Sequence, residues 1–302
     1  MAPMRTGVDH EENFPVASWL CPPAQRPAVV ALYRFARTAD DLADEGTLPA
    51  PQRLQQLTLY RQWLNWADGT LARPQTAGHP SWPELFAHLH THIQKHAWPT
   101  APMHALLDAF EQDVRHTASG HRYQSMAELL DYCSRSANPV GRLLLHVFGV
   151  TDATSLRQSD DICTALQLIN FWQDISIDWP RQRHYLPQDR LDAHGLRLDD
   201  FSPSRPPHAT LDATCSQLVA ELFRHATQTM RRGAPLAWCL EGRFGWELRL
   251  VVHGGLRVAE RAAQQTHQTW RTRPKLTATD MPLLLWRSAR PCPTDTLAPN
   301  RL

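Results

Sequence analysis

Two segments of the chain carry pairs of aspartates four residues apart within otherwise apolar, helix-like sequence. The first segment contains Asp40 and Asp44, and the second, far downstream, contains Asp174 and Asp178. Residues four apart lie on the same face of a helix, so each pair should stack its carboxylates. Two unit charges about 4 Å apart repel by roughly 4 kcal/mol at an effective dielectric near 20. The pattern therefore predicts that both segments bind Mg²⁺ and, through it, a phosphate-bearing ligand.

The second segment extends its acids into a longer polar stripe. Gln167, Asn170, Asp174 and Asp178 would share one helix face between broad apolar flanks. A polar stripe enclosed in this way is not typical of a solvated surface. Carboxylate and amide oxygens are ligands that suit Mg²⁺ better than zinc or copper.

Basic residues accompany both acidic segments. Arg37 precedes Asp40 by three residues, and Arg183 and Tyr185 follow the second segment in a short turn. An arginine so placed can neutralise a carboxylate or bind the oxygens of a diphosphate. The alternative for the first segment is a solvated charged face, in which helix ion pairs are worth a few tenths of a kcal/mol.

Composition excludes several classes of protein. The chain has 302 residues and a formal net charge of +1, so it has no electrostatic footprint for nucleic acid. Six widely spaced cysteines without a C-x-x-C pair indicate reduced thiols. A polar start to the chain and the absence of a long apolar run predict neither a signal peptide nor a membrane span. We expect a cytoplasmic protein, with peripheral contact to the inner membrane left open.

Helical periodicity prevails along the chain, and no strand pattern stands out. We expect one all-α domain over residues 1–287, followed by a disordered, proline-containing tail over 288–302. Asn138 and Pro139 should interrupt one long helix, and Trp179-Pro180 should end another. The helices are predicted at residues 28–44, 54–64, 83–97, 103–115, 126–149, 155–178, 208–232 and 246–268.

Three motifs resemble the squalene and phytoene synthase family of head-to-head prenyl synthases. They are Tyr-Arg-Phe-Ala-Arg-Thr-Ala-Asp-Asp-Leu-Ala-Asp at 33–44, Tyr-Cys at 132–133 followed by Asn-Pro-Val-Gly at 138–141, and the stripe at 167–178 followed by Arg-His-Tyr-Leu-Pro at 183–187. The resemblance covers residues 9–285. It implies a single isoprenoid-synthase helical bundle around a central cavity, with two aspartate-rich helices that face each other across its mouth and bind Mg²⁺ and a prenyl diphosphate.

The finer resemblance is to the bacterial hydroxysqualene synthase branch of hopanoid biosynthesis. It rests on residues 12–18, 136–141 and 170–174. The Asn-Pro pair departs from the small residues typical of phytoene and dehydrosqualene synthases. The resemblance implies that presqualene diphosphate and water give hydroxysqualene and diphosphate. Condensation of two farnesyl diphosphates to presqualene diphosphate or squalene is the alternative, and a non-catalytic helical scaffold is a more distant one.

The same resemblance assigns roles to individual residues. Aromatic faces at Phe14, Tyr33 and Tyr132 would stabilise a passing carbocation. The metal ligands would be Asp40, Asp44, Asn170, Asp174 and Asp178. The catalytic residues would be Asp40, Asp44, Tyr33, Tyr132, Asp174 and Asp178. The substrate-binding residues would be Phe14, Arg37, Gln167, Asn170, Arg183 and Tyr185.

Pro139 allows two interpretations. It should leave a helix carbonyl near residue 135 without its hydrogen bond, and that carbonyl could face the cation or hold the water that quenches it. The favoured interpretation is a purely structural kink.

Overall fold

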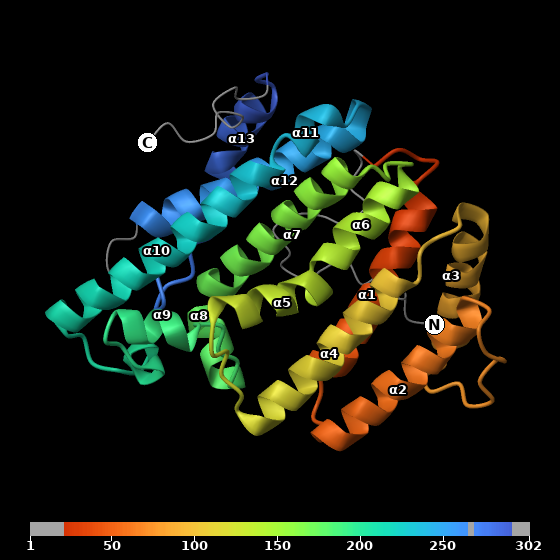
Figure 1. Ribbon diagram of the computed structural model, residues 1–302, viewed down its shortest axis with the longest axis horizontal. Coiled ribbons are helices and arrows are strands. Elements are labelled where there is room, and N and C mark those ends of the chain that lie inside the picture. The colour runs from red at the N-terminus through yellow and green to blue at the C-terminus, as the bar shows by residue number, and fades with distance from the viewer. Residues whose placement is uncertain (1–20, 265–268, 292–302) are drawn as a thin grey trace, which may run out of the picture.

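The computed structural model describes residues 21–264 and 269–291, which form helices and no β-strand (Figure 1). This confirms the predicted all-α class. The elements in chain order are α1 (Arg26–Asp44), α2 (Ala50–Ala67), α3 (Trp82–His96), α4 (Ala101–Ser119), α5 (Met126–Ser136), α6 (Asn138–Val147), α7 (Ala153–Gln173), α8 (Ile175–Asp178), η1 (Trp179–Arg181), α9 (Gln188–Ala193), η2 (Leu198–Phe201), α10 (Ala209–Gly233), α11 (Leu236–Cys239), α12 (Gly242–Gln264), η3 (Ala278–Asp280) and α13 (Met281–Ser288).

The many prolines of the chain start helices instead of breaking them. A proline stands in the first turn of α1, α2, α3, α4, α6 and α13. The N–H groups of a first turn have no partner within the helix, so proline loses nothing there. Ser125 and Asp152 cap α5 and α7 through their side chains, as N-cap residues of these types do.

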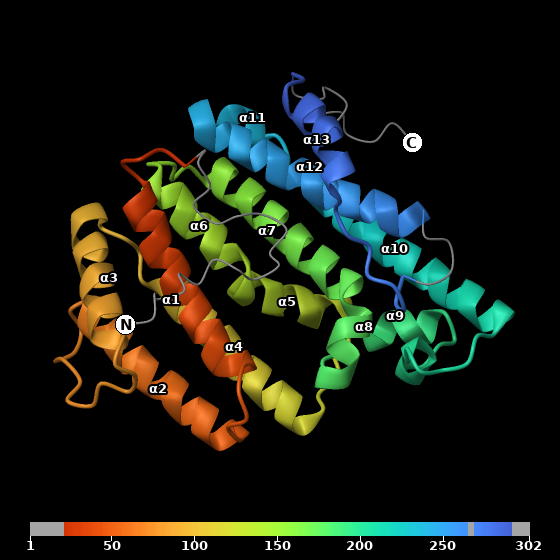
Figure 2. The ribbon, with the colours of Figure 1, turned by 180° about the vertical axis from the view of Figure 1, so that it is seen from behind.

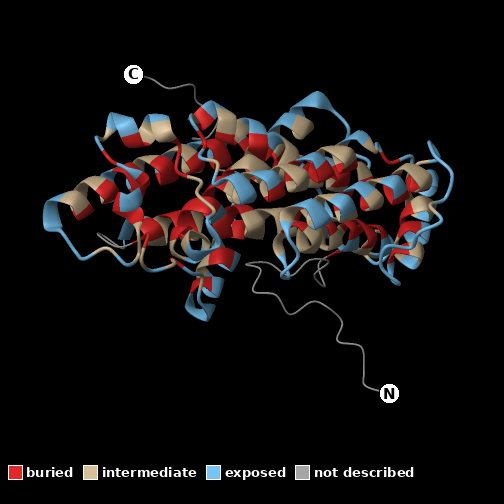
Figure 3. Ribbon diagram, turned by 90° about the horizontal axis from the view of Figure 1, so that it is seen from below, coloured by how far each residue is buried: buried red, intermediate tan, exposed pale blue. Residues whose placement is uncertain are grey.

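The helices form two packed halves that meet along the middle of the molecule. In the first half, α1 to α4 and α6 bury an aromatic cluster that includes Phe35, Tyr60, Trp63 and Phe86. In the second half, α5, α7, α10 and α12 share a larger core. Figures 1 and 2 show α6 and α7 side by side where the halves meet, with α1 next to α6, and Figure 3 shows the buried positions along the inner sides of the helices.

The Asn-Pro interruption is a boundary between two helices. The regular helix is interrupted at Ala137 (φ −118°, ψ −49°), and Pro139 lies in the first turn of α6. The side chain of Thr164 on α7 donates a hydrogen bond to Asn138 Oδ1 at 2.9 Å. The geometry thus supports the structural interpretation of Pro139, because the proline starts a helix whose first residue is tied to α7.

The predicted helix over 155–178 is wrong in one respect. Asp174 (φ −102°, ψ 12°) interrupts it, so that α7 ends at Gln173 and the four-residue α8 follows. The short helices α9 and α11, and also α13, were not predicted from the periodicity. The predicted helix over 246–268 begins earlier, at Gly242, and residues 265–268 and most of the predicted tail lie outside the described residues.

Two buried helical glycines let neighbouring helices approach closely. A Cβ at Gly233 on α10 would lie 2.4 Å from the Gln158 carbonyl oxygen and 2.7 Å from Ile162 Cγ1, both on α7. A Cβ at Gly255 on α12 would meet only flexible side-chain ends, Met230 Cε at 2.9 Å and Leu166 Cδ2 at 3.0 Å. Only the first contact involves backbone that cannot move without displacing α7.

We expect Gly233→Ala to lower the free energy of unfolding by about 2 kcal/mol, because the added methyl group forces α7 and α10 apart. Gly255→Ala is the matched control and should change it by less than about 1 kcal/mol, since side-chain ends can yield and alanine favours the helix. Urea unfolding followed by circular dichroism measures both. Equal effects at the two positions would contradict the backbone contact as the cause.

Candidate active site

A cavity of about 630 Å³ lies between the two halves of the bundle. Side chains of α1, α4, α5, α6, α7, α11 and α12 line it, together with residues of α8 and the turn that follows. Its lining is divided: most of the carboxylates, the amides and the arginines gather at one end, and mainly aliphatic and aromatic side chains make up the rest, with Glu247 on α12 among them. This is the shape and polarity of a site for a ligand with a charged head and an apolar body.

Helix α1 brings the first aspartate pair to the polar end. Asp40 and Asp44 stand one turn apart on the cavity side, while Phe35 and Ala39 are buried in the core on another face. Arg37 forms ion pairs with Asp40 at 2.9 Å and with Asp41 at 2.8 Å. The arginine therefore neutralises part of the negative charge of its own helix.

Arg183 joins the two acidic segments across the cavity. Its Nη1 donates a hydrogen bond to Asp44 Oδ2 at 2.8 Å, and its Nη2 contacts Asp44 Oδ1. The backbone N–H of Arg183 donates to the Asp178 carbonyl at 3.2 Å. Both side chains of the ion pair are largely buried, at 14% and 20% exposed. The predicted convergence of the two segments on one cavity is therefore observed.

Burial and mutual repulsion raise the pKa of the carboxyls at this end. Burial, and then the nearby Asp44, raise the pKa of Asp40 to about 7, against the lowering influence of Arg37. Burial, and then Asp174, raise the pKa of Asp178 to about 7, against the influence of Arg183. These pKa values are raised first by burial and then by repulsion between carboxylates, and the nearby arginines offset only part of the effect.

Asp174 is paired with an arginine that the sequence patterns did not single out. Arg273 Nε lies 2.5 Å from Asp174 Oδ1, and its Nη2 donates to Oδ2 at 3.1 Å. The buried Gln173 side chain donates to the Pro274 carbonyl at 2.6 Å and fixes the segment that carries Arg273. Helical spacing offers no signal for such a contact, because the two residues lie 99 positions apart.

Asp113 on α4 is a second site residue that sequence reasoning missed. The Tyr132 hydroxyl donates a hydrogen bond to Asp113 Oδ2 at 2.5 Å, and both residues line the cavity. Burial raises the pKa of Asp113 to about 7; the bond from Tyr132 lowers it, and Asp44 raises it further. A lone aspartate without a helical acidic partner gives no pattern, although Phe110, three residues earlier, also faces the cavity.

Stacked aromatic rings form a wall beside the acids. The rings of Phe171 and Tyr185 are nearly parallel with centroids 3.7 Å apart, and Tyr132 lies 6.0 Å from Phe171. Tyr33 contributes a further aromatic side chain to the lining from α1. Aromatic faces stabilise a nearby cation through their quadrupole.

The far end of the cavity is apolar. The rings of Phe148, after α6, and Phe244, on α12, stack 3.7 Å apart. Aliphatic side chains complete this end, including Leu144, Leu236 and Leu248. The acid at this end, Glu247, would repel an anionic head group, so a ligand with an anionic head and an apolar body is favoured with its head at the other end.

Each predicted site residue within the described part of the chain lines this one cavity. They are Tyr33, Arg37, Asp40, Asp44, Tyr132, Gln167, Asn170, Asp174, Asp178, Arg183 and Tyr185. Phe14 lies outside the described residues. The break at Asp174 does not remove Gln167, Asn170, Asp174 or Asp178 from the lining.

The donors at the polar end suit Mg²⁺. Among residues 21–264 and 269–291, no three His, Cys, Asp or Glu side chains cluster closely enough to enclose a metal ion. Mg²⁺ does not require such a cage, because it commonly keeps several waters and binds one or two carboxylates together with substrate phosphates. The buried, mutually repelling carboxylates at this end could bind Mg²⁺ in this way, because a cation beside them would reduce their repulsion.

Comparison with known proteins gives a family match over most of the chain. The model of the squalene/phytoene synthase family matches residues 8–280. A hydroxysqualene synthase of Rhodopseudomonas palustris is 36% identical over 253 residues, which cover 82% of this chain and 78% of that protein. A presqualene diphosphate synthase of the same organism is 31% identical over 219 residues, or 72% of this chain and 73% of that protein. The resemblance seen in the sequence motifs is confirmed.

Solved structures agree with the match. A squalene synthase from Alicyclobacillus acidocaldarius superimposes with a TM-score of 0.72 at 31% identity, covering 85% of this chain and 90% of that one. A dehydrosqualene synthase in complex with a ligand superimposes with a TM-score of 0.71 at 19% identity, covering 90% of this chain and 88% of that one. The second likeness concerns the fold alone. The predicted helical bundle around a central cavity is thus confirmed.

The buried Asp113 carboxyl generates a prediction about pH. In the unfolded chain it releases its proton near its ordinary pKa of 3.8, whereas in the fold it keeps the proton to about pH 7. Between these values the unfolded state binds fewer protons, so this group makes stability fall as pH rises. We expect Asp113→Asn, which can still accept the Tyr132 hydrogen bond, to reduce the stability lost between pH 5 and pH 7.5 by about 2 kcal/mol.

Urea unfolding at the two pH values, with a chelator present, measures this loss. Asp131→Asn is the control, because this exposed carboxyl pairs with Arg135 on its own helix and does not line the cavity. It should lose as much stability as the original chain. An unchanged loss in Asp113→Asn would show that Asp113 is ionised in the fold well below pH 7.

Proposed function

The chain belongs to the squalene/phytoene synthase family, and we propose that it is a Mg²⁺-dependent hydroxysqualene synthase. The reaction converts presqualene diphosphate and water into hydroxysqualene and diphosphate. The observation that carries this proposal is the divided cavity, with carboxylates and arginines at one end and apolar walls at the other. The higher identity to hydroxysqualene synthases than to a presqualene diphosphate synthase favours this reaction over condensation of two farnesyl diphosphates.

The polar end would hold the diphosphate. Bound Mg²⁺ supplies positive charge that stabilises the leaving diphosphate as its C–O bond breaks, and Asp40, Asp44, Asn170, Asp174 and Asp178 are the residues that would hold it. Arg183 and Arg37, which pair with Asp44 and Asp40 in the structure, can donate charge-assisted hydrogen bonds to the departing oxygens. Their present partners hold both guanidinium groups at the polar end of the cavity, which supports this role.

The walls of the cavity would stabilise the cation that remains and shield it from bulk water. The stacked rings of Tyr132, Phe171 and Tyr185 lie next to the carboxylates, where a cation forms as the bond breaks. The hydrogen bond from Tyr132 to Asp113 fixes the orientation of the first ring. Beyond them, the apolar end keeps bulk water away from the hydrocarbon chains.

One polar side chain is well placed to orient the water that completes the reaction. Gln167 lines the cavity one helical turn from Asn170, on the apolar side of the acids. A primary amide can donate to and accept from a water molecule at the same time. We therefore assign Gln167 the role of directing water to the cation.

Product analysis by mass spectrometry tests the proposed reaction. With Mg²⁺, presqualene diphosphate should give hydroxysqualene and diphosphate; a chelator should stop the reaction; and farnesyl diphosphate alone should not be consumed. Asp40→Asn should lower the rate at least about 100-fold, because it removes charge that binds the leaving group. The control Asp131→Asn should keep full activity. Consumption of farnesyl diphosphate would favour the condensing alternative, and no turnover of either substrate would favour a scaffold.

The role of Gln167 is tested by the ratio of products. Gln167→Leu keeps much of the side-chain volume but cannot hold water, so the hydroxylated share of the products should fall several-fold relative to eliminated or rearranged hydrocarbons. A ratio is insensitive to the amount of folded enzyme. An unchanged ratio at any rate would contradict the assignment.

A further inference from the structure

Helix α13 carries an apolar face that no described part of the chain covers. Met281, Leu285 and Trp286 are 46%, 49% and 52% exposed, and Pro282 and Ala289 are exposed beside them. These positions recur at helical spacing, whereas the opposite face buries Leu284 and Ser288. A soluble surface normally scatters its exposed apolar residues, so a helix face without a charge over two turns indicates a surface that binds something.

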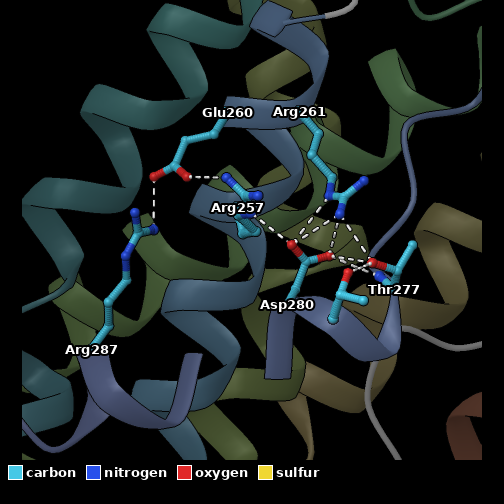
Figure 4. A network of polar contacts seen from close by, with 7 residues as sticks. Arg257, Glu260, Arg261, Thr277, Asp280 and Arg287 are labelled. Atoms are coloured by element: carbon cyan, nitrogen blue, oxygen red, sulfur yellow. Dashed lines mark hydrogen bonds and ion pairs between the residues drawn. The ribbon is translucent and has the colours of Figure 1, made fainter. Parts of the chain in front are cut away.

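A dense ion-pair network ties α13 and the turn before it to α12 (Figure 4). Asp280, just before the helix, accepts from Arg257 Nε at 2.8 Å and pairs with Arg261 at 2.8 Å, both on α12. Arg287 pairs with Glu260 at 2.7 Å. The exposed face is therefore fixed by its anchors, because turning it inward would break three ion pairs to α12.

Arginine and tryptophan side chains continue the face toward α11 and the start of α12. The guanidinium of Arg290 lies 3.9 Å from the Trp286 ring centroid, and the Trp238 indole donates to the Arg290 carbonyl at 2.9 Å. Arg249 lies between Trp238 and the exposed Trp246, 5.6 Å and 5.8 Å from their ring centroids. Tryptophan and arginine combine an apolar body with a polar tip, as the boundary of a bilayer requires.

Charges of both signs lie around this surface, since Glu241 and Glu247 stand near Arg243 and Arg249 at the start of α12. Arg243, Arg249 and Arg290 make no ion pair with any described carboxylate, whereas the acidic Glu260 nearby is already neutralised by two arginines. Unpaired arginines beside exposed tryptophans complement the negative charge of anionic lipid head groups.

The same surface adjoins the apolar end of the cavity. Phe244, Glu247 and Leu248 at the start of α12 line the cavity, while Trp246 between them points to the outside. Figures 1 and 2 show α11, the start of α12 and α13 along the upper edge of the molecule, and α1 running down from that edge toward its acidic end. The charged end of the cavity thus faces away from this surface.

We propose that a docking face formed by Met281, Leu285, Trp286, Arg290 and Trp246 binds the surface of an anionic lipid bilayer. None of the helices in the described part is long and apolar enough to cross a bilayer, so the contact is peripheral. The face would place the apolar end of the cavity next to the hydrocarbon phase in which a released isoprenoid dissolves. This goes beyond the proposed function, because binding to lipid requires no turnover.

Flotation of the full-length protein with vesicles tests the proposal. Vesicles of phosphatidylcholine with about a third phosphatidylglycerol should bind the protein, and pure phosphatidylcholine should bind less. Leu285→Glu should weaken binding about tenfold or more, since it places a charge on the buried side of the contact. Leu71→Glu is the matched control, because Leu71 is equally exposed (54%) in the loop between α2 and α3. It should bind as the original chain does.

The positive charge is tested separately. Arg290→Gln should weaken binding to anionic vesicles and reduce its salt dependence, whereas Arg115→Gln, an exposed arginine on α4, should not. Equal binding by Leu285→Glu and the original chain would overturn the proposal. So would a dimer that Leu285→Glu dissociates without any vesicle binding, which would assign the face to a second copy. Activity with detergent-dispersed substrate should be unchanged in Leu285→Glu, so failure of docking and failure of the proposed reaction are distinguishable.

Discussion

The repulsion among buried carboxylates at one end of the cavity is the constraint on which the rest of the structure depends. Asp40, Asp113 and Asp178 come from three separate segments, and burial makes each of them difficult to ionise. Arg183 offsets part of this repulsion by bridging to Asp44. Buried carboxylates that repel one another favour the binding of a cation beside them. In the proposed reaction, Mg²⁺ bound together with the diphosphate would supply that positive charge.

Holding such groups together requires rigid helices around them. The close approach of α10 to α7 at Gly233 and the bond from Thr164 to Asn138 fix α7, which carries Gln167 and Asn170. The aromatic core under α1 fixes the helix that carries Asp40. Stability from packing thus offsets the cost of the charged site, as is common where function requires groups that are unfavourable in the fold.

The sequence predicted what depends on helical periodicity. Apolar spacing located the long helices, and the i, i+4 pairs placed Asp40 and Asp44 on one face. It could not predict contacts that depend on tertiary structure, such as Arg273 with Asp174 or Tyr132 with Asp113. The break at Asp174 also escaped prediction, because no proline or glycine marks it. Helix α13 was missed because its pattern is apolar on the exposed side as well.

The exposed apolar face of α13 and the division of the cavity have one physical explanation. In the proposed reaction, an amphiphile with a diphosphate head and long hydrocarbon chains would bind with its head near Asp44 and Arg183 and its chains toward Phe148 and Phe244. Loss of the head would leave a largely hydrocarbon product that no longer interacts with the charged end of the site. The favourable route for that product leads through apolar surroundings, and the apolar face of α13 lies at that end of the molecule. A helix that would be a liability on an ordinary soluble surface is therefore placed where a bilayer would cover it.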